Sequence, residues 1–284
     1  MKERVHLFGS HGGLVGVRCD QVEGPRPGHP FVLFANVGLN HRVGPNRIWV
    51  DLARRLARAG FSSLRFDLSG RGDSEARSDA RSDRERGVLD TVEAMDFLGS
   101  RGGGERFVIV ANCSGVDSLH ATALSDRRVV GAVAIDGYAY RNFGYWLRRR
   151  TICLLQPSRF KRWLRRSQAE KQGRRRGAGE AQEVWVRDIP TQAAFASALG
   201  EFQSRGVRLL LVFTGGADQA YNHQGQFEES FGPRAGVEVD FYPRSDHLFS
   251  AVSDRRWLVE RVLAFMNSHY GPGKPVQPEA LHPA

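Results

Sequence analysis

The chain has 284 residues, of which 41% are hydrophobic, so it can build one large or two small domains around a sizeable core. This composition excludes an intrinsically disordered protein, and apolar runs such as residues 31–35 are far too short to span a bilayer. The 41 Lys and Arg residues against 31 Asp and Glu give a net charge of +10. Such an excess is typical of proteins with an anionic partner, but it also arises when arginines gather on solvated faces.

The cysteines and the start of the chain indicate a cellular compartment. Cys19, Cys113 and Cys153 form neither a disulfide framework nor a metal-ligand spacing. The charged and apolar regions that open a secretory signal are absent from the first residues. We therefore expect a cytoplasmic protein in a reducing environment, with no metal and no cofactor.

Short β-rich runs alternate with amphipathic stretches along most of the chain, which is typical of a sheet wrapped by helices. An opening hairpin is predicted over residues 5–19, around the turn G-S-H-G-G. Six further strands are predicted over residues 31–36, 62–67, 106–112, 129–136, 208–213 and 237–242. Several of them are apolar throughout, as strands buried on both faces are. Four helices are predicted over residues 47–59, 88–98, 114–124 and 254–269.

The alternation stops between residues 138 and 205, where the sequence becomes irregular, rich in arginine and bears tryptophan. We interpret residues 138–205 as a helical cap inserted between two parts of one core, residues 1–137 and 206–270. Residues 271–284 are rich in proline and glycine and are predicted to be a disordered tail. The predicted fold class is thus α/β, with a mostly parallel sheet flanked by helices.

One strand runs directly into the segment A-N-C-S-G at 111–115. A strand that leads through small-x-nucleophile-x-small into a helix is the pattern of a nucleophile elbow, whose tight turn tolerates only small flanking residues. This frame puts Cys113 at the nucleophile position. Centring the pattern on Ser114 would require Asn112 and Val116 to be the small residues, and they fit less well. The alternative for the cysteine is a buried structural thiol.

Loops after two later strands offer an acid and a base. Asp218 ends the Gly-rich loop after the strand at 208–213, and His247 ends the loop after the last strand. Together with Cys113 they follow the chain order nucleophile, acid, histidine. Asp136, at the end of an earlier strand, is the alternative acid. The alternative for the histidine is a surface residue in a polar loop.

These features together resemble the α/β-hydrolase superfamily over nearly the whole chain. The segment D-L-S-G-R-G-D-S at 67–74 matches a D-x-x-G-x-G-x-S turn common after the fourth strand of such enzymes, which we interpret as structural. A narrower resemblance, to bacterial hydrolases found with exosortase systems, is carried by four segments: residues 38–47, 66–74, 113–115 and 246–250. That group has largely unassigned substrates, so the resemblance defines the fold more closely than the function. Ala111 stands where glycine is commoner.

The resemblance implies where an oxyanion hole lies. The backbone N–H of Ser114 is one expected donor. The second is expected from the loop after the strand at 31–36, from one of three residues: Val37, Gly38 or Leu39. His41 and Arg42 in the same loop are candidates for binding a substrate carboxylate or phosphate, because arginine makes bidentate contacts. Their alternative is a structural network that pins the loop.

A cysteine nucleophile narrows the chemistry, because a thiolate exchanges readily with thioesters. Cysteine elbows of this superfamily resemble those of dienelactone hydrolases and polyhydroxyalkanoate synthases. We therefore predict an acyl-transfer enzyme, a thioesterase or acyltransferase, that acts on an ester or thioester through an acyl-cysteine. The alternatives are a carboxylesterase acting on a small ester and a non-catalytic binding module with the same fold.

Basic residues dominate the middle of the inserted segment. Between residues 141 and 176 the arginines and lysines face a single acid, Glu170. This section is either a solvated cap or a surface that docks coenzyme A or an acyl carrier protein through their anionic groups. Nucleic acid is not favoured as a partner, because the chain carries no nucleic-acid-binding motif.

Overall fold

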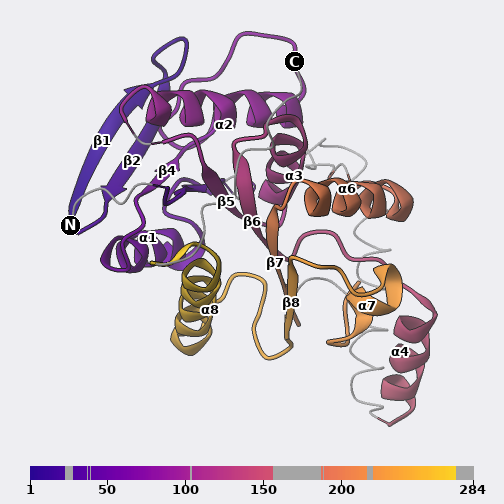
Figure 1. Cartoon of the computed structure of the whole chain (residues 1–284). Helices are drawn as coiled ribbons and strands as arrows, with labels where there is room; N and C mark the ends of the chain where they lie inside the picture. Colours follow the sequence, from indigo (N-terminus) through magenta and orange to yellow (C-terminus); the bar gives the residue numbers. More distant parts are fainter. Residues whose placement is uncertain are drawn as a thin grey trace, which may run out of the picture.

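The computed structural model describes residues 1–22, 28–36, 38, 40–102, 104–155, 187, 189–215 and 220–272, with only the backbone at 152–155. Its centre is an eight-stranded sheet in the order β1-β2-β4-β3-β5-β6-β7-β8 (Figure 1). The strands are β1 (Lys2–Phe8), β2 (Leu14–Asp20), β3 (Phe31–Phe34), β4 (Ser63–Phe66), β5 (Phe107–Asn112), β6 (Val129–Ile135), β7 (Arg208–Thr214) and β8 (Val237–Tyr242). Every strand that the sequence predicts is present.

The direction of the strands decides where the loops meet. β1 pairs with β2, and β2 with β4, in antiparallel fashion, whereas all pairs from β4 to β8 are parallel. The carboxyl ends of these parallel strands therefore lie along one edge of the sheet, the edge at which α/β proteins bind their ligands. The prediction of a mostly parallel α/β sheet is confirmed.

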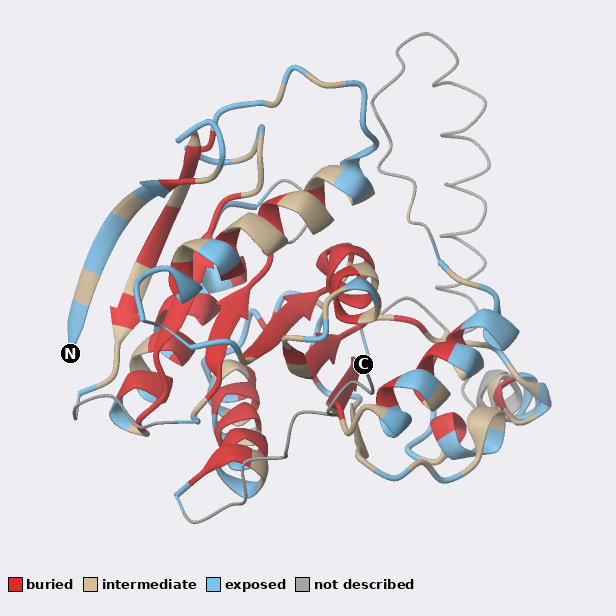
Figure 2. Ribbon diagram, turned by 45° about the horizontal axis from the view of Figure 1, so that its top comes forward, coloured by how far each residue is buried: buried red, intermediate tan, exposed pale blue. Residues whose placement is uncertain are grey.

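Helices cover both faces of the sheet (Figures 1 and 2). They are α1 (Ile48–Arg58), α2 (Asp83–Gly99), α3 (Gly115–Ser125), α4 (Phe143–Leu155), α6 (Gln192–Ser204), α7 (Gln226–Phe231) and α8 (Val252–Tyr270). The core residues of α1 and α8 pack on one face, and those of α2, α3 and α6 pack on the other. α2 begins at Asp83 instead of 88, because Ser82 and Glu85 form a capping box one turn before the apolar pattern starts.

Burial is deepest in the middle of the sheet, as Figure 2 shows. All six residues of β5 are buried, and so are all four of β3 and of β4. β1 lies at the edge and is mostly exposed. The strand that carries Asn112 at its end is therefore clamped between two helical layers, and the residue that follows it is held in a fixed place.

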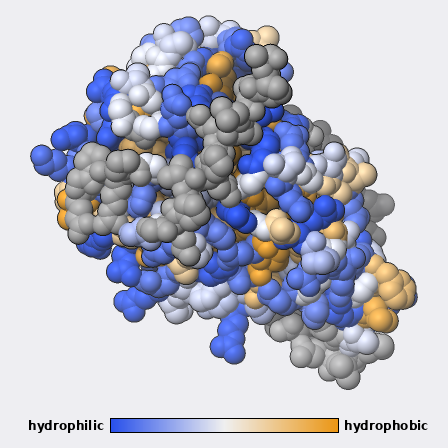
Figure 3. Space-filling model, in the orientation of Figure 1, coloured by the Kyte–Doolittle hydropathy of each residue, from blue (hydrophilic) through white to orange (hydrophobic). Residues whose placement is uncertain are grey.

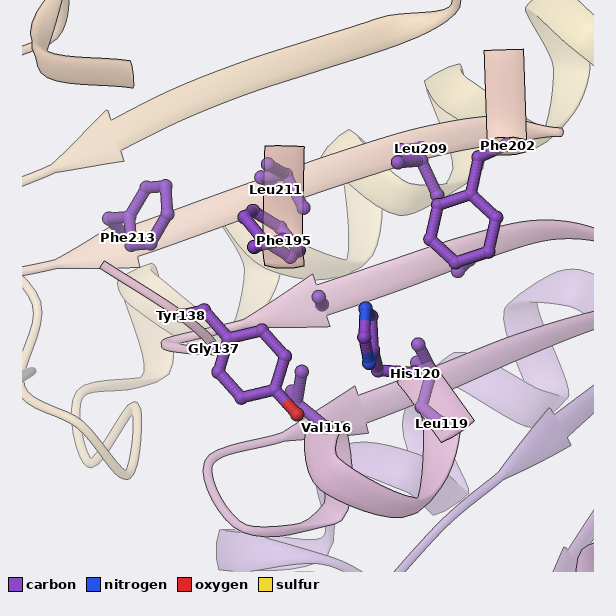
Figure 4. Close-up of a pocket in the computed structure, with 12 residues that line it drawn as sticks. Val116, Leu119, His120, Gly137, Tyr138, Phe195, Phe202, Leu209, Leu211 and Phe213 are labelled. Atoms are coloured by element: carbon purple, nitrogen blue, oxygen red, sulfur yellow. The ribbon is translucent and has the colours of Figure 1, made fainter. Parts of the chain in front are cut away.

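A small cavity of about 20 Å³ lies between α3, α6 and the strands β6 and β7 (Figure 4). His120 points into it, is 6% exposed, and has no hydrogen-bond partner for either ring nitrogen within the described residues. The rings of Tyr138, Phe195 and Phe202 surround the imidazole at centroid distances of 5.3, 5.7 and 5.9 Å. Burial lowers the pKa of His120 to about 4, so its side chain is neutral at pH 7.

Replacing His120 with leucine should stabilise the protein at pH 7 by about 1–3 kcal/mol, because a buried polar ring without partners costs free energy. The variant should also lose part of the acid sensitivity. The folded pKa lies below the usual 6.5, so the unfolded chain takes up the proton first, and stability falls as the pH drops from 6.5 towards 4.

Urea unfolding at pH 7 and pH 5 measures both effects, with the same substitution at the exposed His11 as the control. A His120→Leu variant that is less stable than the parent at pH 7, with an unchanged difference between the two pH values, would contradict this account.

Candidate active site

The turn after β5 places Cys113 at the edge where the parallel strands end. Cys113 has a φ of +51°, a left-handed conformation that non-glycine residues seldom adopt, and α3 starts two residues later. A Cβ atom on Gly115 would lie 2.4 Å from the carbonyl oxygen of Asn36, so only glycine fits there. The same Cβ would contact that of Ala111 at 3.4 Å. Small residues at both ends thus allow the sharp strand-to-helix turn of a nucleophile elbow.

Three side chains meet at this turn. Nδ1 of His247 lies 2.9 Å from Oδ2 of Asp136, and the imidazole and the Cys113 thiol lie close enough for each to shift the pKa of the other. Asp136 follows β6 directly and is 4% exposed. Its carboxylate also accepts hydrogen bonds of 2.7 Å from both the backbone N–H and the hydroxyl of Thr214. Asp136 is therefore fixed as an acceptor towards the histidine.

The sequence offers two candidates, Asp218 and Asp136, for the carboxylate that orients His247. Asp218, the first choice from the sequence, lies outside the described residues. Asp136, the alternative, is the carboxylate that contacts His247. Asp246 shapes the histidine loop instead, because it accepts hydrogen bonds from the N–H groups of Leu248 and Ser250 at 2.8 and 3.2 Å.

The backbone of the histidine loop is held on two sides. The side chain of Asn112 donates to the carbonyl of His247 at 3.3 Å, and the side chain of Asn46 donates to the carbonyl of Leu248 at 3.0 Å. Phe249 in the same loop is left-handed, with a φ of +52°, and is buried. The loop of His247 is thereby tied to the end of β5 and to the turn before α1.

The electrostatics of the site favour an ionised pair. The hydrogen bonds to Asp136 and then to Cys113 raise the pKa of His247 to about 10. Burial by itself opposes ionisation of the Cys113 thiol, but the hydrogen bond from His247, followed by the charges of His247 and Arg187, lowers its pKa below the ordinary value. Cys19, in contrast, is buried in the core, and burial raises its pKa to about 11. The two thiols differ in the way that separates a reactive cysteine from an inert one.

Ser114 connects the elbow to the loop after β3. Its backbone N–H lowers the pKa of the Cys113 thiol, and its hydroxyl accepts a 2.9 Å hydrogen bond from the N–H of Gly38. Gly38 is left-handed, with a φ of +51°. Val37 and Leu39, the other two predicted donors of this loop, lie outside the described residues. The loop after β3 thus contacts the elbow through a hydroxyl group for which the sequence assigned no role.

Arg42 is engaged in a network around the buried carboxylate of Asp67. Its guanidinium forms ion pairs with Asp67 and, at 2.6 Å, with Asp73, and its backbone N–H donates to Asp67 at 2.5 Å. Asp67 also accepts a hydrogen bond of 3.2 Å from the side chain of Asn36. These contacts favour the structural interpretation of Arg42 over a role in binding substrate. His41 is exposed on the same loop.

The same network explains the 67–74 segment. A Cβ atom on Gly72 would lie 2.5 Å from the carboxylate of Asp67, and Ser74 donates its hydroxyl proton to the backbone carbonyl of Asp67 at 2.7 Å. The glycine therefore makes room for the carboxylate, and the serine closes the turn. This geometry agrees with the structural role expected for the segment.

A second group of side chains near Cys113 carries no signal in the sequence. The guanidinium of Arg187 binds the buried carboxylate of Asp117 at 2.9 Å and lies 5.7 Å from the centre of the Tyr138 ring. Asp117 lies in the first turn of α3, directly after the elbow. The positive charge of Arg187 favours the thiolate form of Cys113. No spacing rule links residues that lie 70 positions apart in the sequence.

Within the described part of the chain, no group of three or more His, Cys, Asp or Glu side chains is placed to bind a metal ion. None of the helices over the residues that the structure describes is long and apolar enough to cross a bilayer.

Comparison with known proteins assigns the class. A model of the Alpha/beta hydrolase family matches residues 31–261. The chain therefore belongs to the alpha/beta hydrolase family and is an enzyme of the hydrolase type, which disfavours the non-catalytic module that the sequence left open. No curated protein matches the sequence.

Solved structures share the fold at low identity. Est1E from Butyrivibrio proteoclasticus has a TM-score of 0.59 at 11% identity, covering 94% of this chain and 98% of its own. The esterase domain of a Rhodothermus marinus protein has a TM-score of 0.57 at 15% identity, with 95% and 100% covered. The alpha/beta hydrolase GrgF from Penicillium sp. sh18 has a TM-score of 0.55 at 15% identity, with 95% and 98% covered.

The site geometry predicts how the thiols react. Cys113 should be alkylated by iodoacetamide faster than Cys19 at pH 7, because its thiolate is favoured. Replacing His247 with alanine should move the midpoint of the rate–pH profile of Cys113 to higher pH and slow the reaction at pH 7. Mass mapping of the alkylated peptides gives the rates separately.

The exposed His41→Ala variant is the control and should leave the profile unchanged. A Cys113 profile that is the same with and without His247 would show that the imidazole does not favour the thiolate.

Proposed function

We propose that the protein is an acyl-transfer enzyme of the thioesterase or acyltransferase type, with Cys113 as nucleophile, His247 as general base and Asp136 as the acid that orients it. One observation carries the proposal. Asp136 holds the imidazole of His247 by a 2.9 Å hydrogen bond, and this imidazole interacts with the thiol of Cys113 at a left-handed strand-to-helix turn. The arrangement supports the roles of a catalytic triad, which is recognised by geometry.

The first half of the reaction forms an acyl-enzyme. His247 holds the proton of the Cys113 thiol, with Asp136 stabilising the imidazolium. The thiolate attacks the acyl carbonyl, a C–S bond forms, and the negative charge moves to the carbonyl oxygen. We assign the N–H of Ser114 to bind that oxygen, because the N–H of Gly38 already donates to the Ser114 hydroxyl. The leaving group departs with the proton from His247, and a thioester to Cys113 remains.

The second half releases the acyl group. His247 takes a proton from water, or from an acceptor alcohol or thiol, and the resulting nucleophile attacks the thioester carbonyl. The C–S bond breaks, and the proton on His247 returns to the sulfur. Water as the acceptor gives hydrolysis, and an alcohol or thiol gives acyl transfer. The same residues serve both outcomes.

A cysteine nucleophile supports an ester or thioester as the substrate, because thiols exchange readily with thioesters. Coenzyme A or an acyl carrier protein is the proposed donor, and the cytoplasm is the proposed location. The basic residues from 156 to 176 that motivated this donor lie outside the described residues. The division at residues 138 and 205 and the resemblance to exosortase-associated hydrolases stay proposals of the same kind.

A carboxylesterase that acts on a small ester through the same triad is the second candidate. It is supported by the names of two structural neighbours, Est1E and the esterase domain from Rhodothermus marinus. The two candidates differ in whether a thioester is turned over faster than the oxyester of the same acid. Rates on a matched pair of acyl substrates separate them.

The nucleophile assignment predicts a covalent adduct. An acyl thioester should add its acyl mass to the Cys113 peptide, and hydroxylamine should remove it. Cys113→Ala should form no adduct, whereas Cys113→Ser should accumulate a slowly turning-over oxyester, because His247 can still activate a hydroxyl. Mass spectrometry of the digested protein locates the adduct.

The control for this experiment removes the hydroxyl of the neighbouring residue, Ser114. Ser114→Ala should still form the adduct on Cys113, because its hydroxyl accepts a hydrogen bond from the N–H of Gly38 and the proposal uses only its backbone N–H. An adduct on Ser114, or one that survives in Cys113→Ala, would remove the cysteine from the nucleophile position.

The acid assignment predicts that Asp136→Asn lowers kcat by about 100-fold or more, because the amide no longer fixes the imidazole tautomer. The fold should persist, since the amide still fits the site and the backbone contacts of the turn are unchanged. Steady-state kinetics beside Asp218→Asn tests the choice. A larger loss in Asp218→Asn than in Asp136→Asn would make Asp218 the acid.

A further inference from the structure

The exposed face of α4 carries an apolar stripe. Phe143 is 83% exposed, Trp146 is 46% exposed and Leu147 is 54% exposed. Their spacing of i, i+3 and i+4 puts the three side chains on one side of the helix. Figure 3 shows hydrophobic atoms at the end of the molecule where Figure 1 places α4. Three large apolar residues exposed side by side form a candidate site of interaction.

Cationic side chains border this stripe. The guanidinium of Arg141 lies 5.6 Å from the centre of the Trp146 ring, and that of Arg149 lies 6.0 Å from it. Arg150 is exposed one turn after Trp146 and Leu147. Two arginines of the helix also contact the protein: Arg148 pairs with Glu229 at 2.8 Å, and Arg149 donates to the hydroxyl of the buried Tyr145 at 2.5 Å. The face thus presents Phe, Trp and Leu side chains within a border of arginines.

We propose that this α4 face, made of Arg141, Phe143, Trp146, Leu147, Arg149 and Arg150, binds the surface of an anionic lipid bilayer. Apolar and aromatic side chains beside arginines are the composition of helices that lie in the membrane interface. The apolar stripe enters the headgroup region, while the arginines and the net charge of +10 are attracted by anionic lipids. The protein docks peripherally, by one helix face.

Two other occupants fit this surface less well. A second copy of the chain would bring like charges together around the stripe, which opposes self-association. An acidic carrier protein would pair its carboxylates with the arginines. Those carboxylates would give no apolar contact to the ring of Phe143, which is 83% exposed. A bilayer supplies both the negative charge and the apolar interior.

Sedimentation of the full chain with vesicles tests the proposal. The protein should bind vesicles of equal parts phosphatidylglycerol and phosphatidylcholine. Binding should be far weaker to phosphatidylcholine alone and should fall as salt is added.

Phe143→Ala should weaken binding by about tenfold through lost apolar burial. Arg150→Gln should weaken it by about fivefold through lost charge. Vesicles should also shift the tryptophan emission to the blue, and Trp146→Phe should reduce that shift.

Matched controls use residues of similar exposure elsewhere. Val5→Ala and Leu7→Ala on β1, which are 68% and 69% exposed, should bind as the parent does, and so should the exposed Arg244→Gln. Cys113→Ala should also bind normally, so docking is tested independently of the catalytic proposal. Equal loss in the β1 controls, no loss in Phe143→Ala, or capture by an acidic carrier protein without vesicle binding would overturn the proposal.

Discussion

The parallel register of β5 and β6 is the constraint on which the site depends. Asn112 pairs with Ile135 at the ends of the two strands, so the next residues, Cys113 and Asp136, leave the sheet at the same level. Both adopt left-handed backbone, with φ angles of +51° and +47°. Such conformations cost about 1–3 kcal/mol each and persist only where the surroundings impose them. Here the buried strands between the two helical layers hold both residues in these conformations. A single loop after β8 then brings His247 to both side chains.

Much of this fold could be predicted from the sequence, because its signals are local. Strands buried on both faces are apolar throughout, and the glycine at 115 marks a turn that admits no side chain. The cysteine at the elbow follows from the small residues around it. The apolar pattern predicts the start of α2 too late in the chain. The first turn of this helix is polar, and the capping box of Ser82 and Glu85 fixes it instead of an apolar face.

The contacts that complete the site could not be predicted in the same way. Asp136 and Asp218 each follow a strand, and sequence order alone does not tell which carboxylate turns towards the histidine. The donors of Thr214 that hold Asp136 come from a strand 78 residues away. The hydroxyl of Ser114 meets Gly38 across 76 residues. Pairs of this kind depend on side-chain direction after folding, which neither periodicity nor spacing encodes.

The segment between β3 and α1 connects the two sides of the site. Asn36 and Arg42 hold it against the carboxylate of Asp67, while Asn46, at its other end, holds the carbonyl of Leu248 beside the base. One short segment thus contacts both the carboxylate of Asp67 and the backbone of the histidine loop. Its path fixes the two sides of the site relative to each other.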